Sequence, residues 1–200
     1  MLASTKFCLL FFCRIINTDV LLVAMYIPPS NSAYFDERYF ENLDLIFKTF
    51  RSYQLIILGD LNSRIGTPSY DATFCYVQNP DTSTNANGIR LLKWLMNNDI
   101  VIVNGLIRNH KCFDSNFTFF RGSLCSQNDL ILSNSPSIID SMKIMNKMIY
   151  SDHTPISTNI VIKPSCSRNF LLRCSEGTLC DDHLDINKRK PPVVILSKVD

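Results

Sequence analysis

The strongest constraint on the fold is a short apolar run, residues 55–58, that ends abruptly at Gly59 and Asp60. A continuous apolar run of this length is typical of a strand that is buried on both faces. Residues 100–103 repeat the pattern and end at Asn104. Such strands need packed layers on either side, so the two runs predict a layered domain rather than an open sheet.

Helix and strand patterns alternate along the rest of the chain. Residues 7–16 and 20–27 are apolar runs that we expect to pair as antiparallel strands across a short turn. Ser32 is the expected N-cap of an amphipathic helix over residues 33–50. The other expected elements are a helix over residues 89–96 and strands over residues 117–120, 129–132, 142–148 and 155–162. This alternation predicts an α/β (α+β) sandwich, and in such folds ligands collect at the strand ends.

Length and composition fit one such domain. The chain has 200 residues, of which 46% are hydrophobic and 19% charged, so a packed core is expected and wholesale disorder is not. We expect the domain over residues 7–162 and an irregular C-terminal tail over residues 163–200. The tail holds four residues of types that bind zinc, but their spacing matches no standard zinc-ligand pattern: Cys166, Cys174, Cys180 and His183.

Charge and hydropathy limit which binding partners and which cellular location we expect. The formal net charge is only +2, so a nucleic-acid partner would be held locally rather than over the whole surface. No apolar run approaches the roughly 20 residues of a membrane span, and no small-residue cleavage site follows the apolar residues 7–13. The 8 cysteines include no Cys-x-x-Cys pair. We therefore expect a nuclear or cytoplasmic chain with reduced thiols, and no secretion.

Three polar clusters lie where the expected strands begin or end. Asp60 and Asn62 follow the first buried strand, and in an extended backbone their side chains would face the same side. Taken alone, the motif is better explained by a simple Gly-Asp turn. Asp129 begins a later strand, where a carboxylate can orient a histidine. Asp152 offers a hard oxygen ligand for Mg²⁺ or Mn²⁺, and His153 offers a proton-transfer group. Together these residues suit phosphate chemistry.

In this order the clusters resemble the motifs of the endonuclease/exonuclease/phosphatase superfamily, which has the DNase-I-like fold. The matching strings are Gly59-Asp-Leu-Asn62, Ser126-x-x-Asp129, Ser151-Asp-His153 and the strand-ending Tyr26-Ile-Pro28. Residues 59–66, 87–92 and 102–104 are most similar to endonuclease domains of non-LTR (LINE-type) retrotransposons, in which a reverse transcriptase accompanies the nuclease.

The resemblance implies a role for each matched residue. It assigns activation of the attacking water to Asp60 and a contact with the scissile phosphate to Asn62. His153, oriented by Asp129, would stabilise the charge that builds up on the phosphate in the transition state. Tyr26 would hydrogen-bond the phosphate or assist the leaving group.

The resemblance also implies a four-layered fold of two packed β-sheets flanked by helices, DNA as the partner, and Mg²⁺ (or Mn²⁺) bound with the help of Asp152. Members of the superfamily carry an Asn and a metal-binding Glu on early strands. We expect Met1 to follow both, so that the domain is N-terminally truncated. Three hypotheses stay open: an active DNA endonuclease, a non-catalytic remnant that serves as a binding or structural module, and a phosphatase of the same superfamily.

Overall fold

The centre of the computed structural model, which describes residues 8–15, 18–67, 76–108, 111–145, 150–161 and 195–196, is a five-stranded sheet. Its strands, in spatial order, are β1 (Cys8–Ile15), β2 (Thr18–Met25), β3 (Gln54–Asp60), β10 (Asp129–Ser133) and β5 (Val101–Ile102). β2 and β3 are parallel, and the other neighbouring strands are antiparallel. The predicted antiparallel pairing of the first two strands is therefore confirmed.

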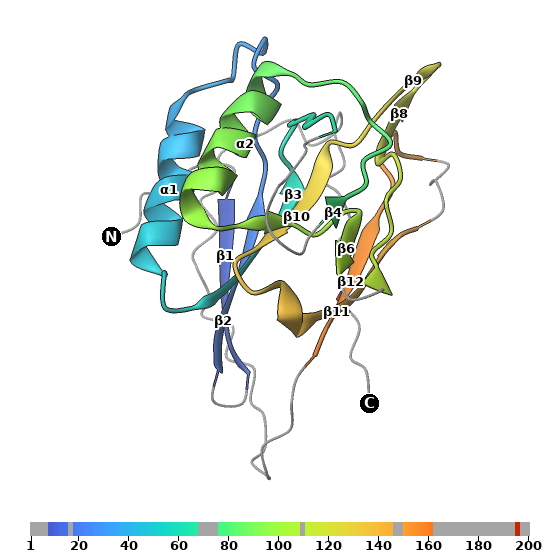
Figure 1. Ribbon diagram of the computed structural model, residues 1–200. Coiled ribbons are helices and arrows are strands. Elements are labelled where there is room, and N and C mark those ends of the chain that lie inside the picture. The colour runs from blue at the N-terminus through green and yellow to red at the C-terminus, as the bar shows by residue number, and fades with distance from the viewer. Residues whose placement is uncertain are drawn as a thin grey trace.

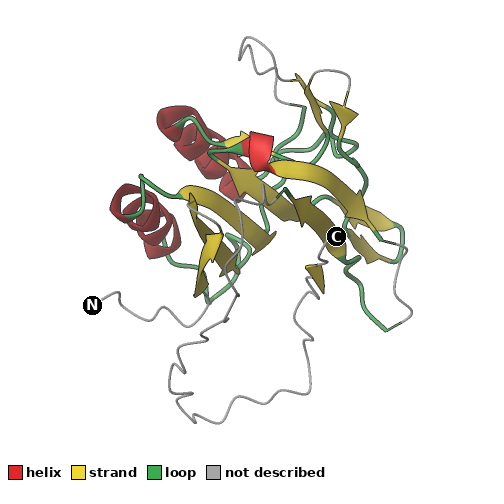
Figure 2. Cartoon of the chain, turned by 90° about the horizontal axis from the view of Figure 1, so that it is seen from below, coloured by secondary structure: helices red, strands yellow, loops and turns green. Residues whose placement is uncertain are grey.

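Helices cover one face of this sheet and smaller sheets cover the other. The helices α1 (Arg38–Thr49) and α2 (Ala86–Asn98) lie side by side (Figure 1). The smaller sheets are β4 (Tyr76–Val77), β6 (Leu106–Arg108) and β7 (Lys111–Cys112); β8 (Phe119–Arg121) and β9 (Leu124–Ser126); and β11 (Ile139–Ile144), β12 (Ile156–Ile160) and β13 (Ile195–Leu196). A 3-10 helix, η1 (Pro136–Ile138), leads into β11. Seen from below, the two long helices lie together at one side of the strands (Figure 2).

Alternating side chains of the central strands build two separate cores. Because successive residues of a strand point to opposite faces, Leu55 and Ile57 of β3 face the helices while Ile56 and Leu58 face the smaller sheets. The helix-side core also contains Leu21, Val23, Leu43, Leu91 and Leu95. The opposite core contains Val20, Leu22, Val103, Leu106, Phe113, Ile131 and Met142. β3 is thus buried on both faces, and the predicted α/β sandwich is confirmed.

Helix α1 begins at Arg38, so the prediction of a helix from residue 33 with Ser32 as its N-cap is wrong. The Ser32 hydroxyl instead accepts a hydrogen bond from the backbone N–H of Tyr34, two residues later. The Asp36 carboxylate does the same for Arg38. Short polar side chains that bond nearby N–H groups stabilise turns in place of helix, which delays the start of α1.

The predicted boundary at residue 162 stays a prediction, because most of the tail, including its three cysteines and His183, lies outside the described residues. Two tail residues are described, and they form β13, which pairs in parallel with β12. Neither long helix of the described chain has the length and apolar character required to span a bilayer. Nuclear or cytoplasmic location stays a prediction.

Gly59 allows β3 to approach the end of β2. Its φ of 143° is in a region that residues with a side chain rarely adopt. A Cβ atom at this position would lie 2.0 Å from the carbonyl oxygen of Met25, which belongs to the neighbouring strand. The glycine before Asp60 is therefore required by the sheet itself.

We expect Gly59→Ala to lower the free energy of unfolding by about 3 kcal/mol or more, because backbone strain and a backbone clash add together. Gly122→Ala is the matched control: Gly122 also has a positive φ, 61°, but nothing lies within 4 Å of its added Cβ. Its cost should be roughly 1 kcal/mol. Urea unfolding of both variants measures the difference, and equal losses would contradict the role of the Met25 contact.

Candidate active site

The candidate site forms where the end of β3 lies beside the start of β10. In the antiparallel register Asp60, the last residue of β3, is the direct partner of Asp129, the first residue of β10. Both side chains are buried. Directly opposed residues point to the same face of a sheet, so two motifs that are far apart in the sequence bring their carboxylates together.

His153 completes this pair. Its Nδ1 atom lies 2.9 Å from Oδ2 of Asp129, and its Nε2 atom lies 3.9 Å from Oδ2 of Asp60. The imidazole packs against Phe119 of β8, with ring centroids 5.1 Å apart. The backbone N–H of Thr154 also donates to the carbonyl of Thr118, 2.7 Å away, which attaches the histidine loop to the same strand region. Asp129 therefore orients His153, and Nε2 is the ring nitrogen on the side of Asp60.

Asn62 adopts a left-handed backbone with φ of 45°, so the extended geometry predicted for residues 60–62 is wrong. Asn tolerates this conformation better than most residues. Its amide Nδ2 donates to Oδ2 of Asp60 and to the carbonyl of Ile27, both at 3.0 Å, and its backbone N–H donates to Oδ1 of Asp60. Both amide hydrogens are used, so Asn62 orients Asp60 in this state, and a phosphate would have to replace one of these bonds.

Tyr26 and Asp152 are sequence neighbours of residues that contact or form the cluster, Ile27 and His153. Tyr26 is half-buried after β2, next to Ile27, whose backbone N–H donates to the carbonyl of Asp60. Asp152 is exposed. The roles predicted for Tyr26 and Asp152 stay predictions.

The electrostatics of the cluster favour the protonated forms of Asp60 and His153. Burial, followed by the charge of Asp129, raises the pKa of Asp60 to about 7, against the opposing effects of His153 and the hydrogen bonds from Asn62. Burial alone would lower the pKa of His153. The hydrogen bond to Asp129 and the charges of Asp129, Asp60 and Asp152 outweigh that effect, so the pKa of His153 is raised.

Two buried polar residues that position Asp129 were not assigned a role from the sequence. The hydroxyl oxygen of Thr118 accepts hydrogen bonds from the backbone N–H groups of Asn128 and Asp129, at 3.1 and 3.0 Å. The side chain of Asn104 donates to the carbonyl of Asp129 and accepts from the N–H of Ile131. The sequence signal that could have identified them is a polar residue within or directly after an apolar run, because such a residue is buried and needs a hydrogen-bond partner.

A divalent cation would find only part of its ligands in the described residues. Among them, no three His, Cys, Asp or Glu side chains are grouped so that they could hold a metal ion. Mg²⁺, however, is commonly bound through one or two carboxylates, with water and substrate phosphate as the other ligands. Asp152, an exposed carboxylate directly before His153, is available as one such ligand. The donors thus fit an ion shared with a phosphate.

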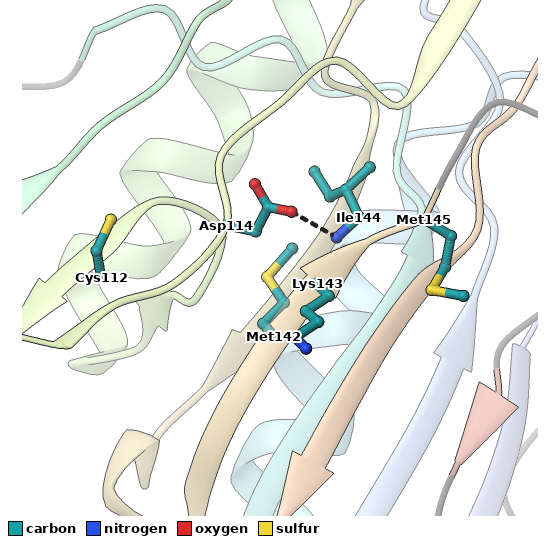
Figure 3. A pocket seen from close by; sticks show the side chains of 6 residues that line it. All are labelled: Cys112, Asp114, Met142, Lys143, Ile144 and Met145. Atoms are coloured by element: carbon teal, nitrogen blue, oxygen red, sulfur yellow. Dashed lines mark hydrogen bonds between the residues drawn. The ribbon is translucent and has the colours of Figure 1, made fainter.

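A separate open cleft of about 480 Å³ lies between β7 and β11 (Figure 3). Its lining residues are Cys112, Asp114, Met142, Lys143, Ile144 and Met145. The carboxylate of Asp114 accepts a hydrogen bond from the N–H of Ile144, 3.0 Å away. None of the six predicted site residues lines this cleft.

Comparison with known proteins agrees with this geometry. The profile of a family described as endonuclease-reverse transcriptase matches residues 20–157, and this chain belongs to that family. Its fold is similar to that of the endonuclease domain of TRAS1, a telomere-specific non-LTR retrotransposon, with a TM-score of 0.55 and 19% identity over 75% of this chain. The chain spans 59% of the length of that domain.

A second solved structure, an endonuclease/exonuclease/phosphatase family protein from Leptotrichia buccalis C-1013-b, aligns with a TM-score of 0.49 and 16% identity, covering 74% of this chain and 50% of the other. A search of curated proteins gave no match. The predicted membership in the endonuclease/exonuclease/phosphatase superfamily is confirmed by the family match together with the fold.

The raised pKa values predict that the folded state loses stability as the pH rises from the ordinary Asp pKa of 3.8 to about 7, and further as the pH passes through the raised pKa of His153. Folded Asp60 keeps its proton until about pH 7, whereas the unfolded chain loses it near 3.8, so this contribution is lost as the pH approaches 7. The contribution of His153 is complete below its ordinary pKa of 6.5 and is lost above its raised value, so it has the same sign. Urea unfolding in metal-free buffer at several pH values measures the slope.

Asp60→Asn should flatten this slope, because it removes the group with the larger shift. Asp44→Asn is the matched control, since Asp44 pairs only with Lys48 on the surface of α1 in the described contacts. An unchanged slope in Asp60→Asn would contradict the protonation of Asp60 in the folded state.

Proposed function

We propose that this chain is a metal-dependent DNA endonuclease domain that hydrolyses phosphodiester bonds. The single observation that supports this most is the cluster in which Asp129 orients His153 towards Asp60, which is in turn held by Asn62. Both the matched family, endonuclease-reverse transcriptase, and the similar TRAS1 domain are described as endonucleases, and this supports DNA as the substrate.

His153 is suited to contact the phosphate. With Nδ1 donating to Asp129, Nε2 is directed towards the side of Asp60, 3.9 Å from its carboxylate. One water molecule can accept from Nε2 and donate to the Asp60 carboxylate, whereas a phosphate oxygen would accept from Nε2 alone. Because the pKa of His153 is raised, the charged form, which donates from Nε2, is favoured and would stabilise the negative charge that develops on the phosphate.

Asp60 is suited to act as the general base. Its pKa of about 7 lies close to neutral pH, where a base is most effective. In the proposed step the ionised carboxylate takes a proton from a water molecule, whose oxygen forms a bond to phosphorus while the bond to the leaving oxygen of the sugar breaks. Asn62 would keep the carboxylate oriented, and Tyr26 is the proposed donor to the phosphate or to the leaving group.

A bound Mg²⁺ or Mn²⁺ would supply Lewis-acid stabilisation of the phosphate charge. The proposed ligand from this chain is the exposed Asp152, with water and phosphate oxygens as the other ligands. DNA and the metal ion would thus meet at the ends of β3 and β10.

Nicking of supercoiled plasmid tests the proposal. The purified chain should convert supercoiled to open-circular DNA with Mg²⁺ or Mn²⁺ and not with EDTA. Asp60→Ala and His153→Ala should each lower the rate by ~10²- to 10⁴-fold, the usual contribution of an acid–base group. Asp44→Ala, which removes a surface carboxylate of α1, should leave the rate unchanged.

Three results would contradict the proposal. Nicking that survives in both site variants would come from a contaminant. No nicking by folded wild-type protein would favour a non-catalytic remnant. Release of phosphate from inositol phosphates without DNA cleavage would favour a phosphatase.

A further inference from the structure

The pairing of Asp60 with Asp129 has an electrostatic cost that His153 and Asn62 offset only in part. Asp60 and Asp129 are carboxylates directly opposite each other on adjacent strands, an arrangement that is destabilising in a sheet. They form the last pair of the β3–β10 ladder. One backbone hydrogen bond follows, from the N–H of Leu61 to the carbonyl of Asn128 at 3.1 Å, before the two segments separate. The two carboxylates therefore face each other at the end of the ladder.

Asp81 connects the two segments just beyond that point. Its carboxylate is 2% exposed and accepts two hydrogen bonds from the guanidinium of Arg64, from Nε at 2.8 Å and from Nη2 at 2.6 Å. It also accepts from the backbone N–H of Gln127 at 3.2 Å and from that of Ser83 at 3.1 Å. Arg64 is four residues after Asp60, and Gln127 is two residues before Asp129.

The Arg64–Asp81 pair is more than a surface ion pair. Exposed pairs contribute little, whereas this one is bidentate, has a buried acceptor and includes a backbone donor of the β9–β10 turn. The loop that carries Arg64 is fixed from a second side by Asn85, which accepts from the N–H of Arg64 at 3.1 Å and donates to the carbonyl of Asn62 at 2.9 Å. Movement of Arg64 would thus be transmitted to Asn62.

We propose that Asp81 and Arg64 are positioning residues of the site: together they hold the Asp60 loop and the Asp129 turn at the separation that lets His153 contact Asp129 and face Asp60. Neither residue touches the reacting atoms in this assignment. The inference rests on the proposed function for its kinetic test, but its structural test does not.

The kinetic test compares Arg64→Lys, Asp81→Asn and the control Asp44→Asn. Lysine keeps the charge of Arg64 but cannot bond both carboxylate oxygens in one plane, and asparagine keeps the shape of Asp81 but loses its charge. For Arg64→Lys and Asp81→Asn we expect kcat on a DNA duplex to fall ~10- to 100-fold. KM should stay within about twofold of the wild-type value, because misplacement of a catalytic group affects the chemical step. Asp44→Asn should match wild type, although it also breaks an ion pair, with Lys48.

The structural test follows the His153 imidazole by NMR in protein labelled with ¹⁵N-histidine, without DNA or metal. The chain has only 3 histidines, and His153→Ala identifies the signal. We expect a protected Nδ1 proton in wild type and Asp44→Asn, and its loss or exchange broadening in Arg64→Lys and Asp81→Asn, all measured below the melting temperature of each variant.

The outcomes separate the two proposals. Loss of the Nδ1 signal in both variants supports the positioning role even if wild type cleaves no DNA, in which case the proposed function alone fails. If the folded variants retain both the wild-type kcat and the signal, the positioning role is overturned. A raised KM with unchanged kcat and signal also overturns it, because Arg64 would then contact the DNA directly.

Discussion

The antiparallel pairing of β3 with β10 is the interaction on which the rest of the site depends. It places Asp60 opposite Asp129, and it sets the distance across which His153 can reach both carboxylates. β3 lies in the middle of the main sheet, with one core between it and the helices and another between it and the smaller sheets. The packing of the whole domain therefore holds these two strand ends in register.

Placing two carboxylates together in a buried position has a cost, and the surrounding polar residues show how it is offset. Asn62 donates to Asp60, and Thr118 and Asn104 bond the backbone on either side of Asp129. Buried polar groups are tolerated when their partners are in place, and this network supplies most of them. The remaining electrostatic cost appears as the raised pKa of Asp60, and this raised pKa is the reason for proposing Asp60 as the base.

Sequence patterns predicted the parts of the fold that depend on local order. The apolar run before Gly59 identified β3, and the order of the polar motifs identified the superfamily, which the family match confirms. The start of α1 was predicted wrongly because Ser and Asp side chains occur both in turns and as helix N-caps. Ser32 and Asp36 form turns here, and the sequence does not distinguish the two uses. The extended backbone predicted for Asn62 was wrong. Its left-handed conformation depends on contacts with Asp60 and Ile27, which the local sequence does not reveal.

The sequence by itself determined which residues lie next to the strand ends, and thus which chemical groups are available: carboxylates at Asp60 and Asp129, and an imidazole at His153. Only the tertiary structure decided which of these groups meet. Strand register makes direct partners of residues 60 and 129, and Asp81 bonds residues 17 and 46 positions away. Such contacts arise from packing and from the need of each buried polar group for a partner, and neither requirement leaves a local pattern along the chain.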